Sequence, residues 1–146
     1  MTDVKRPTPG VSLCVFGHEG VLIVKRARAP YAGLWSLPGG KPRFGEPLPA
    51  AALRELREET GLTARLAGLV DVIDLMGEEA GERFHYVLTV FAARHETGVP
   101  RPASDVAAAR FAPLSELHQL PMTPRAEELI VKAAAPLNLI HHRPPR

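Results

Sequence analysis

The sequence predicts an α+β fold in which helices cover a mixed β-sheet. Apolar, β-branched runs outnumber helical patterns, and neighbouring runs are joined by short polar turns of the hairpin type. Only two longer segments combine helical periodicity with helix start signals. At 146 residues the chain is long enough for one well-cored domain and too short for two of ordinary size. We therefore expect a single domain over residues 1–146, with a folded core at about 10–139 and short tails.

Several strands are expected along the chain. The runs VSLCVFG and VLIVKRA, separated by HEG, predict an opening hairpin. The segment RAPYAGLWSLPGG, with prolines and glycines around a tryptophan, predicts a shaped loop. LAGLVDVIDLM and RFHYVLTVFAAR then predict two strands joined by the polar GEEAGE, and AARFAPL predicts a further short strand. The segment LSELHQL indicates a helical turn.

Two helices are expected. The first is PLPAAALRELREETG, with prolines in its first turn, strong helix formers and Gly61 at its end. The second is TPRAEELIVKAAA, with Thr123 as N-cap and Pro124 at the first helical position. Leu129 and Ile130 lie on its apolar face, together with Ala133.

Composition excludes several classes of protein. The formal net charge is +2, but the tails carry four basic side chains and one acid, which leaves 14 basic and 15 acidic side chains in residues 7–142. No basic stripe is visible, so a polymeric nucleic acid is not an expected partner. Cys14 is the only cysteine and lies in an apolar run, which predicts an inert core thiol and a reducing compartment. No segment resembles a membrane span or a signal sequence, so we expect a cytoplasmic protein.

The first predicted helix carries a cluster of three carboxylates. At about 100° per residue, Pro49, Ala52, Leu53 and Leu56 fall in one arc, which predicts the stripe that packs on the sheet. The neighbouring arc holds Glu55, Glu58 and Glu59, and Arg54 and Arg57 are turned further away. One interpretation is a solvated face with Arg54–Glu58 pairing. The other is a site for Mg²⁺ or Mn²⁺, because these ions prefer oxygen ligands and offset the repulsion between the carboxylates.

The spacing around this cluster is specific. From Gly40, five residues precede Glu46 and seven more precede Arg54; then come Glu55, Leu56, any residue, Glu58, Glu59, any residue, Gly61 and Leu62. This segment resembles the Nudix box at every position, and the order of strands and helices resembles the Nudix order over most of residues 10–135. The resemblance implies a Nudix fold, an α/β/α sandwich, and hydrolysis of a nucleoside diphosphate linked to a group X.

The resemblance also implies roles for residues of the box. Glu58 and Glu59 correspond to the principal metal ligands, and Glu55 to a further ligand or the general base. Arg54 corresponds to a residue that orients a carboxylate by hydrogen bonding without touching substrate. The metal would be Mg²⁺ or Mn²⁺, and the expected metal shell is Gly39 (through its carbonyl oxygen), Glu55, Glu58, Glu59 and, as a supporting residue, Glu46. No serine has a histidine and an acid arranged around it, so covalent catalysis is not expected.

Five residues outside the carboxylate cluster are candidates for substrate binding. Arg26 and Lys41 could reach phosphates, or could be solvated charges at strand ends. Trp35 could stack on a base, or could pack its loop against the core. His85 alternates with Tyr86 on a strand, so only one of them faces a given side. Asp105 lies where relatives often carry an extra acid, in competition with four other acids, namely Glu78, Glu79, Glu82 and Glu96.

Three functions remain open at this point. The first expectation is a Mg²⁺-dependent pyrophosphohydrolase that acts on ADP-ribose or a similar diphosphate. The next is a nucleoside triphosphate pyrophosphatase of the type that removes 8-oxo-dGTP. A non-catalytic Nudix sensor would bind a nucleotide without cleaving it, but it predicts loss of metal-binding glutamates, and all of them are present. The expected partner is a small nucleotide. Dimers are common in the family that the sequence resembles, but the sequence itself leaves the oligomeric state open.

Overall fold

The structure is a computed structural model and describes residues 4–137. None of the helices among these residues is long and apolar enough to cross a membrane. The elements in chain order are β1 (Thr8–Gly17), β2 (Gly20–Arg26), β3 (Trp35–Ser36), β4 (Gly39–Gly40), α1 (Leu48–Thr60), β5 (Thr63–Glu79), β6 (Glu82–Thr97), β7 (Val106–Ala112), the 3₁₀ turn η1 (Leu114–Gln119), α2 (Ala126–Ala134) and the 3₁₀ turn η2 (Ala135–Leu137).

The strands form one mixed sheet, as the sequence predicts. Its order is β3-β2-β1-β6-β5, with β4 paired to β1 and β7 paired to β2. Strands β1 and β6 are parallel, whereas the β1–β2 and β5–β6 pairs are antiparallel hairpins. Both predicted hairpins are therefore confirmed, and β5 and β6 are longer than the apolar runs that predict them. The last strand, β7, is also confirmed.

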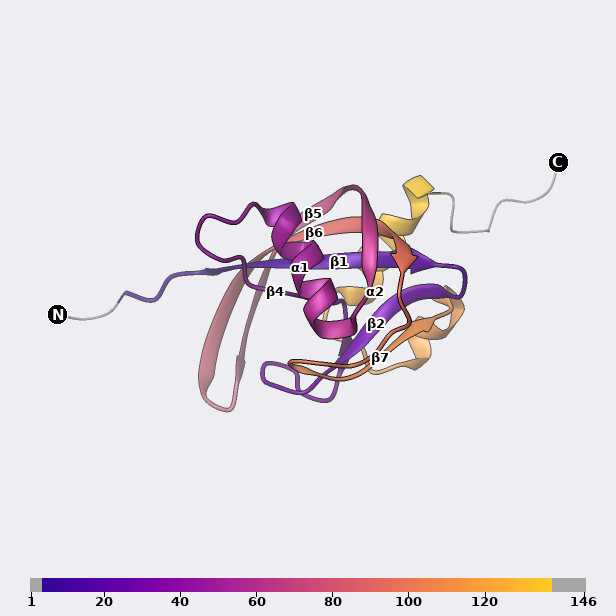
Figure 1. Cartoon of the computed structure of the whole chain (residues 1–146). Coiled ribbons are helices and arrows are strands. Elements are labelled where there is room, and N and C mark those ends of the chain that lie inside the picture. Colours follow the sequence, from indigo (N-terminus) through magenta and orange to yellow (C-terminus); the bar gives the residue numbers. More distant parts are fainter. Residues whose placement is uncertain (1–3, 138–146) are drawn as a thin grey trace.

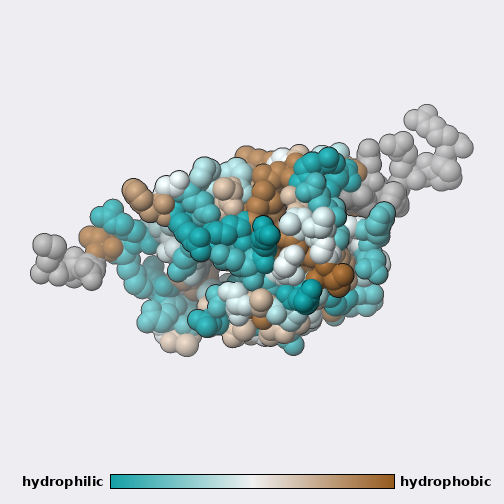
Figure 2. Space-filling model, in the orientation of Figure 1, coloured by the Kyte–Doolittle hydropathy of each residue, from teal (hydrophilic) through white to brown (hydrophobic). Residues whose placement is uncertain are grey.

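The two helices cover opposite faces of this sheet (Figure 1). Strand β1 alternates between the two cores, because successive side chains point to opposite faces. Leu13 packs in the cluster beneath α1, while Cys14 packs in the cluster beneath α2. The α+β sandwich is thus confirmed, and burial raises the pKa of the Cys14 thiol to about 12, consistent with an inert core residue. Figure 2 shows hydrophilic residues gathered over α1, which therefore presents a polar outer surface.

Two local predictions are wrong. Helix α2 begins at Ala126, because Arg125 has a left-handed backbone (φ 69°) that turns the chain immediately before the helix. Thr123 is not the N-cap, and Pro124 is not in the first helical turn; the Thr123 N–H donates to the carbonyl oxygen of Trp35 at 2.8 Å instead. On α1, Pro49 is exposed, whereas Ala52 and Leu56 are buried as predicted. The expected upper limit of the core, near residue 139, lies outside the described residues.

Candidate active site

Helix α1 is held so that its carboxylates face a glycine turn. Pro47, in an extended conformation, is the residue before the first helical position. Gly61 ends the helix with a left-handed backbone (φ 77°), and its N–H donates a hydrogen bond to the Arg57 carbonyl oxygen at 2.9 Å. The apolar side of the helix, including Ala52 and Leu56, packs against the sheet. The neighbouring side therefore has its acidic residues at the edge of the core.

Strand β4 requires glycine at both of its positions. It pairs antiparallel with β1, with Gly39 opposite Ser12 and Gly40 opposite Val11. A Cβ atom at Gly39 would collide with the Val11 carbonyl oxygen, and one at Gly40 would collide with the carboxylate of Glu55. Gly39 thus allows the backbone of β4 to approach β1 closely, and Gly40 allows it to approach Glu55, the first acid of the cluster.

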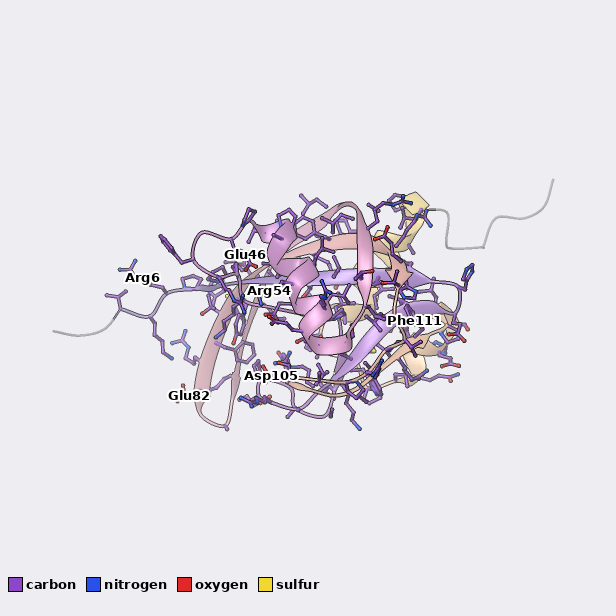
Figure 3. All side chains as sticks on the ribbon, viewed as in Figure 1. Arg6, Glu46, Arg54, Glu82, Asp105 and Phe111 are labelled. Carbon is purple, nitrogen blue, oxygen red and sulfur yellow. The ribbon has the colours of Figure 1, made fainter. Side chains whose placement is uncertain are left out.

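Arg54 links three of the acids. Its Nε donates to Glu46 Oε2 at 2.7 Å, and its Nη1 donates to Glu55 Oε1 at 2.7 Å and to Glu58 Oε1 at 3.0 Å. The prediction that Arg54 is turned away from the cluster is wrong, because its flexible side chain reaches back across the helix surface. Figure 3 labels Glu46 beside the start of α1 and Arg54 further along the same helix. Arg57, in contrast, is exposed as predicted.

Glu46 is held in its ionised form by this network. Its carboxylate accepts the Arg54 bonds and also the backbone N–H of Arg43 at 2.9 Å. These bonds, first of all the one from Arg54, hold the pKa of Glu46 at about 2. Hydrogen bonding to Glu46 likewise raises the pKa of Arg54. Both groups are charged at neutral pH, so the network fixes the guanidinium beside Glu55 and Glu58.

Glu59 has a different environment. It is only 7% exposed and accepts one backbone N–H, from Gly39, at 3.0 Å. Among residues 4–137 it makes no ion pair. Burial raises the pKa of Glu59 to about 8, and the charges of Glu55 and Asp105 act in the same direction, against the effects of the Gly39 N–H and Arg26. This buried carboxylate therefore lacks a cation.

The residues present fit a hard divalent cation. Every donor in the cluster is an oxygen, and a cation beside Glu59 would offset the cost of burying its charge. Within residues 4–137, no three acidic, histidine or cysteine side chains already converge on a common point. A closed protein cage is not needed for Mg²⁺, which is held by one or two carboxylates and completed by water and substrate phosphates.

A cavity of about 530 Å³ opens beside this cluster. It is lined by most of the residues that the sequence singles out, namely Arg26, Gly39, Lys41, Arg54, Glu55, Glu58, Glu59 and Asp105. Glu46 does not line the cavity but contacts Arg54, which does. The structure thus gathers residues from β2, the glycine turn, α1 and the segment before β7 around one space.

Asp105 reaches the cavity because its segment is tied to the end of α1. The N–H of Ala103 donates to the Glu59 carbonyl oxygen at 2.9 Å, and the N–H of Arg101 donates to that of Thr60 at 3.0 Å. The Asp105 side chain pairs with Arg28 at 3.1 Å, and both side chains are exposed. Figure 3 shows Asp105 on the β7 side, across from the start of α1.

Two of the five substrate-binding candidates lie outside the cavity. Trp35 packs against the core beneath α2, and the Arg110 guanidinium carbon lies 5.6 Å from the centre of its ring. His85 lies on the other face of the β5–β6 hairpin, where its Nε2 is 2.8 Å from Asp74 Oδ1. The structure therefore favours the packing role for Trp35 and a surface hydrogen bond to Asp74 for His85.

Other residues in the cavity were missed from sequence. Arg28 and Tyr31 come from the loop after β2, Arg43 from the loop before α1, and Tyr86 from β6. The signal for Tyr86 was present, because the alternation on β6 places it opposite His85, on the cavity side. Nothing local in the sequence indicates that the loop residue Tyr31 meets this strand.

Comparisons with known proteins agree with this architecture. The sequence model described as "NUDIX domain" matches residues 6–133. An ADP-ribose pyrophosphatase from Methanocaldococcus jannaschii is 32% identical over 114 residues, which cover 78% of this chain and 66% of that protein. A Mycobacterium tuberculosis protein, provisionally named 8-oxo-dGTP diphosphatase 2, is 37% identical over 119 residues, or 81% of this chain and 82% of that protein.

Among solved structures, a MutT NUDIX hydrolase from Burkholderia pseudomallei superimposes with a TM-score of 0.77 and 32% identity. The superposition covers 88% of this chain and 98% of that one. The match of the family model, over residues 6–133, includes the glutamate cluster of α1. The chain therefore belongs to the NUDIX domain family and is one of its hydrolases.

Proposed function

We propose that this hydrolase uses Mg²⁺ or Mn²⁺ to cleave the phosphoanhydride of a nucleoside diphosphate linked to a group X. The proposed substrate is ADP-ribose or a similar compound. One observation carries the proposal: a single cavity joins the α1 carboxylates to Arg26 and Lys41. Within residues 4–137, neither Arg26 nor Lys41 pairs with a carboxylate. These two cations match the two charges of a diphosphate.

The acidic residues would hold the metal. Glu58 and Glu59, with the Gly39 carbonyl oxygen, are the proposed ligands, and Glu55 is a further ligand or the base. When bound, the divalent cation neutralises charge on the phosphate oxygens and promotes ionisation of water. Arg54 and Glu46 keep the carboxylates in place through the bonds described above.

The reaction needs no covalent intermediate with the protein. The oxygen of water forms a bond to one phosphorus, the anhydride P–O bond breaks, and the leaving phosphate takes the electron pair. Glu55, or another carboxylate of the cluster, accepts the proton of the water. Arg26 and Lys41 orient the phosphates through charge-assisted hydrogen bonds.

Charge balance favours a diphosphate over a triphosphate. The other cations that line the cavity are already paired, Arg28 with Asp105, Arg43 with Glu58, and Arg54 with the acids of the network. A triphosphate would have to displace one of these acids from its partner. The similarity to the Methanocaldococcus jannaschii ADP-ribose pyrophosphatase supports the same choice.

A second candidate is a nucleoside triphosphate pyrophosphatase of the 8-oxo-dGTP type. The similarity to the mycobacterial relative favours it, since that match covers more of both chains. The exposed pairs Arg28–Asp105 and Arg43–Glu58 could also open at low cost, because surface ion pairs contribute only about 0–1 kcal/mol. A third reading, the sensor without catalysis, conflicts with the complete set of glutamates in the box.

A substrate panel with product identification tests the proposal. We expect ADP-ribose to yield AMP and ribose 5-phosphate with Mg²⁺ or Mn²⁺, and no turnover when the metal is removed by a chelator. Faster cleavage of 8-oxo-dGTP to its monophosphate would select the second candidate. Tight binding without any cleavage would select the sensor. Full turnover in metal-free buffer would contradict the metal-based proposal, and light scattering would test whether the protein forms a homodimer.

A further inference from the structure

Three aromatic rings stand together at the side of the cavity formed by the β5–β6 hairpin. The ring centroids of Phe84 and Tyr86 are 6.1 Å apart, and those of Tyr31 and Phe84 are 5.6 Å apart in an edge-on arrangement. Tyr31 and Tyr86 line the cavity, whereas Phe84 does not. We call these three residues the aromatic wall.

The aromatic wall is built by segments far apart in the sequence. Figure 1 shows β5 and β6 extending together beyond the rest of the sheet, and Figure 3 marks Glu82 at the tip of this hairpin. Phe84 faces Gly77 across the two strands, and a Cβ at Gly77 would collide with the Phe84 ring. The glycine therefore lets Phe84 lie against the strand and support the two tyrosines from behind.

Tyr31 is held against this hairpin by its backbone. Its N–H donates to Glu79 Oε1 at 2.8 Å, and its backbone is left-handed (φ 66°), which is uncommon for a tyrosine. The carbonyl oxygen of the preceding Pro30 accepts a bond from Arg26 Nε at 2.6 Å. The loop is thus fixed on one side to a phosphate-binding candidate and on the other to the hairpin.

The wall has no catalytic task in the proposed reaction, yet both tyrosines are only half-buried and face the same cavity as the α1 acids. Apolar side chains continue this surface from neighbouring positions on the two strands, Ile73 and Leu75 on β5 and Leu88 on β6. A flat, apolar surface with aromatic faces, next to a site for phosphates, suits a planar heteroaromatic ring.

We propose that Tyr31 and Tyr86 bind the base of the nucleotide by stacking, with Phe84 and Glu79 as positioning residues. This inference rests on the proposed function for the assignment of the phosphate end. Stacking is tolerant of base identity, so the aromatic wall supplies affinity for a base and leaves the choice between adenine and an oxidised guanine to other contacts.

Titration calorimetry with two simple ligands tests the proposal in the presence of Mg²⁺. AMP carries a base but no phosphoanhydride, and inorganic pyrophosphate carries phosphates but no base. For Tyr86→Ala and Tyr31→Ala we expect the Kd of AMP to rise by about 5- to 150-fold, the range for loss of one stacking partner. The Kd of pyrophosphate should change by no more than about twofold, because the phosphate end is unchanged.

Two matched controls sharpen this test. Tyr86→Phe keeps the ring and should bind AMP within about twofold of the wild type. His85→Ala removes the adjacent ring on the opposite face of the hairpin and should also leave AMP binding unchanged. If circular dichroism shows that Tyr86→Ala fails to fold, Tyr31→Ala still tests the proposal, because Tyr31 lies in a loop and not in a strand of the sheet. Unchanged AMP binding in Tyr31→Ala, or equal losses for AMP and pyrophosphate, would overturn the proposal.

Glu79 needs a separate readout, because it acts through Tyr31. Glu79→Gln keeps an acceptor oxygen and should restore most of the AMP affinity that Glu79→Ala loses. Combining Glu79→Ala with Tyr31→Ala should weaken AMP binding no more than Tyr31→Ala alone, since the two residues form one unit. Additive losses would show that Glu79 has no positioning role.

Hydrolysis of ADP-ribose by the wild type is measured separately. An inactive protein whose AMP affinity depends on Tyr31 and Tyr86 would contradict the proposed function and support the base site. An active enzyme whose AMP affinity is unchanged by substitution of either tyrosine would support the proposed function and contradict the base site.

Discussion

The cavity has two walls that are stabilised in different ways. The acidic wall comes from one continuous segment, β4 to the end of α1, and Arg54 holds Glu46, Glu55 and Glu58 through short charge-assisted bonds. The aromatic wall comes from the loop after β2 and from β6, and contacts between Tyr31, Phe84 and Tyr86 hold it together. One wall is local and ionic, whereas the other is long-range and apolar.

This difference separates the reaction from the choice of substrate. Ionic bonds at fixed geometry tolerate few replacements, because each lost partner leaves a charge unpaired. Ring contacts tolerate exchanges of similar shape, which change the surface offered to a ligand without moving the carboxylates. We therefore expect substitutions in the acidic wall to lower kcat and substitutions in the aromatic wall to raise KM.

The largest effect is expected for Glu59→Gln. If Glu59 holds metal, this substitution should lower kcat by about 10²-fold or more, the scale for loss of one electrostatic stabiliser of a transition state. Arg57→Gln is the matched control, since it also removes one charge from α1 but at an exposed position. It should change kcat by no more than about twofold. If Glu59→Gln and Arg57→Gln have equal, small effects in steady-state kinetics, the acidic residues form only a solvated helix face and bind no metal.

The metal-free protein should lose stability as the pH rises. Its Glu59 has a pKa of about 8, above the ordinary value of 4.5, so the folded state keeps a proton that the unfolded state has lost. The stabilising contribution is complete below pH 4.5 and is lost as the pH rises through about 8. Its size is of the order of a few kcal/mol.

Urea unfolding with a chelator, at several pH values, measures this contribution. Glu59→Gln should be more stable than the wild type near pH 8, and the difference should shrink toward pH 5. Added Mg²⁺ should favour the wild type, because a ligand that binds only the folded state stabilises it. A pH-independent difference between the two proteins would contradict the buried, cation-free environment of Glu59.

Arg54→Lys should have an intermediate effect. Lysine keeps the charge but cannot bond Glu46, Glu55 and Glu58 together, since it lacks the planar fork of arginine. Loss of a residue that orients metal ligands typically lowers metal affinity or activity by about 10- to 100-fold, and we expect the lower end because the charge remains. Arg43→Lys, at the exposed pair with Glu58, is the control and should be nearly silent. Activity titrations with Mg²⁺ distinguish the two variants.

The acidic wall was predictable from sequence because its parts are neighbours in the chain. The spacing from Gly40 to Leu62 placed Glu55, Glu58 and Glu59 on one side of a helix, and the structure keeps them there. The helical wheel placed Arg54 away from the cluster, because it gives the position of the Cα and not the reach of a long side chain. The Arg54–Glu58 pairing considered from sequence does form. Likewise, the start of α2 depended on the left-handed backbone of Arg125, which has no local signal.

The aromatic wall could not be predicted in the same way. The sequence showed that Tyr86 and His85 point to opposite faces of β6. Which of these faces lines the cavity depends on the parallel pairing of β6 with β1 and on the position of the loop after β2. Tyr31 contacts Glu79 and Phe84, which are far from it in the sequence. The short strands β3 and β4 were expected as a loop, because two-residue strands exist only through their long-range partners.

The smallest effect on the reaction is expected for Trp35→Ala, although Trp35 is the only tryptophan and lies two residues from the cavity residue Leu37. Its ring packs against the core beneath α2 and the Arg110 guanidinium, and its backbone bonds the segment before α2 through Pro121 and Thr123. Because this side chain is half-buried, its removal should lower the free energy of unfolding by about 2 kcal/mol, less than the 3–5 kcal/mol typical of a fully buried aromatic ring. Its KM and kcat should stay within about twofold of the wild type, since the ring does not line the cavity. Thermal unfolding and steady-state kinetics on the same samples check both parts, and Trp35→Phe should recover much of the lost stability. A tenfold rise in KM with an unchanged Tm would instead place Trp35 on the substrate and extend the aromatic wall across the cavity.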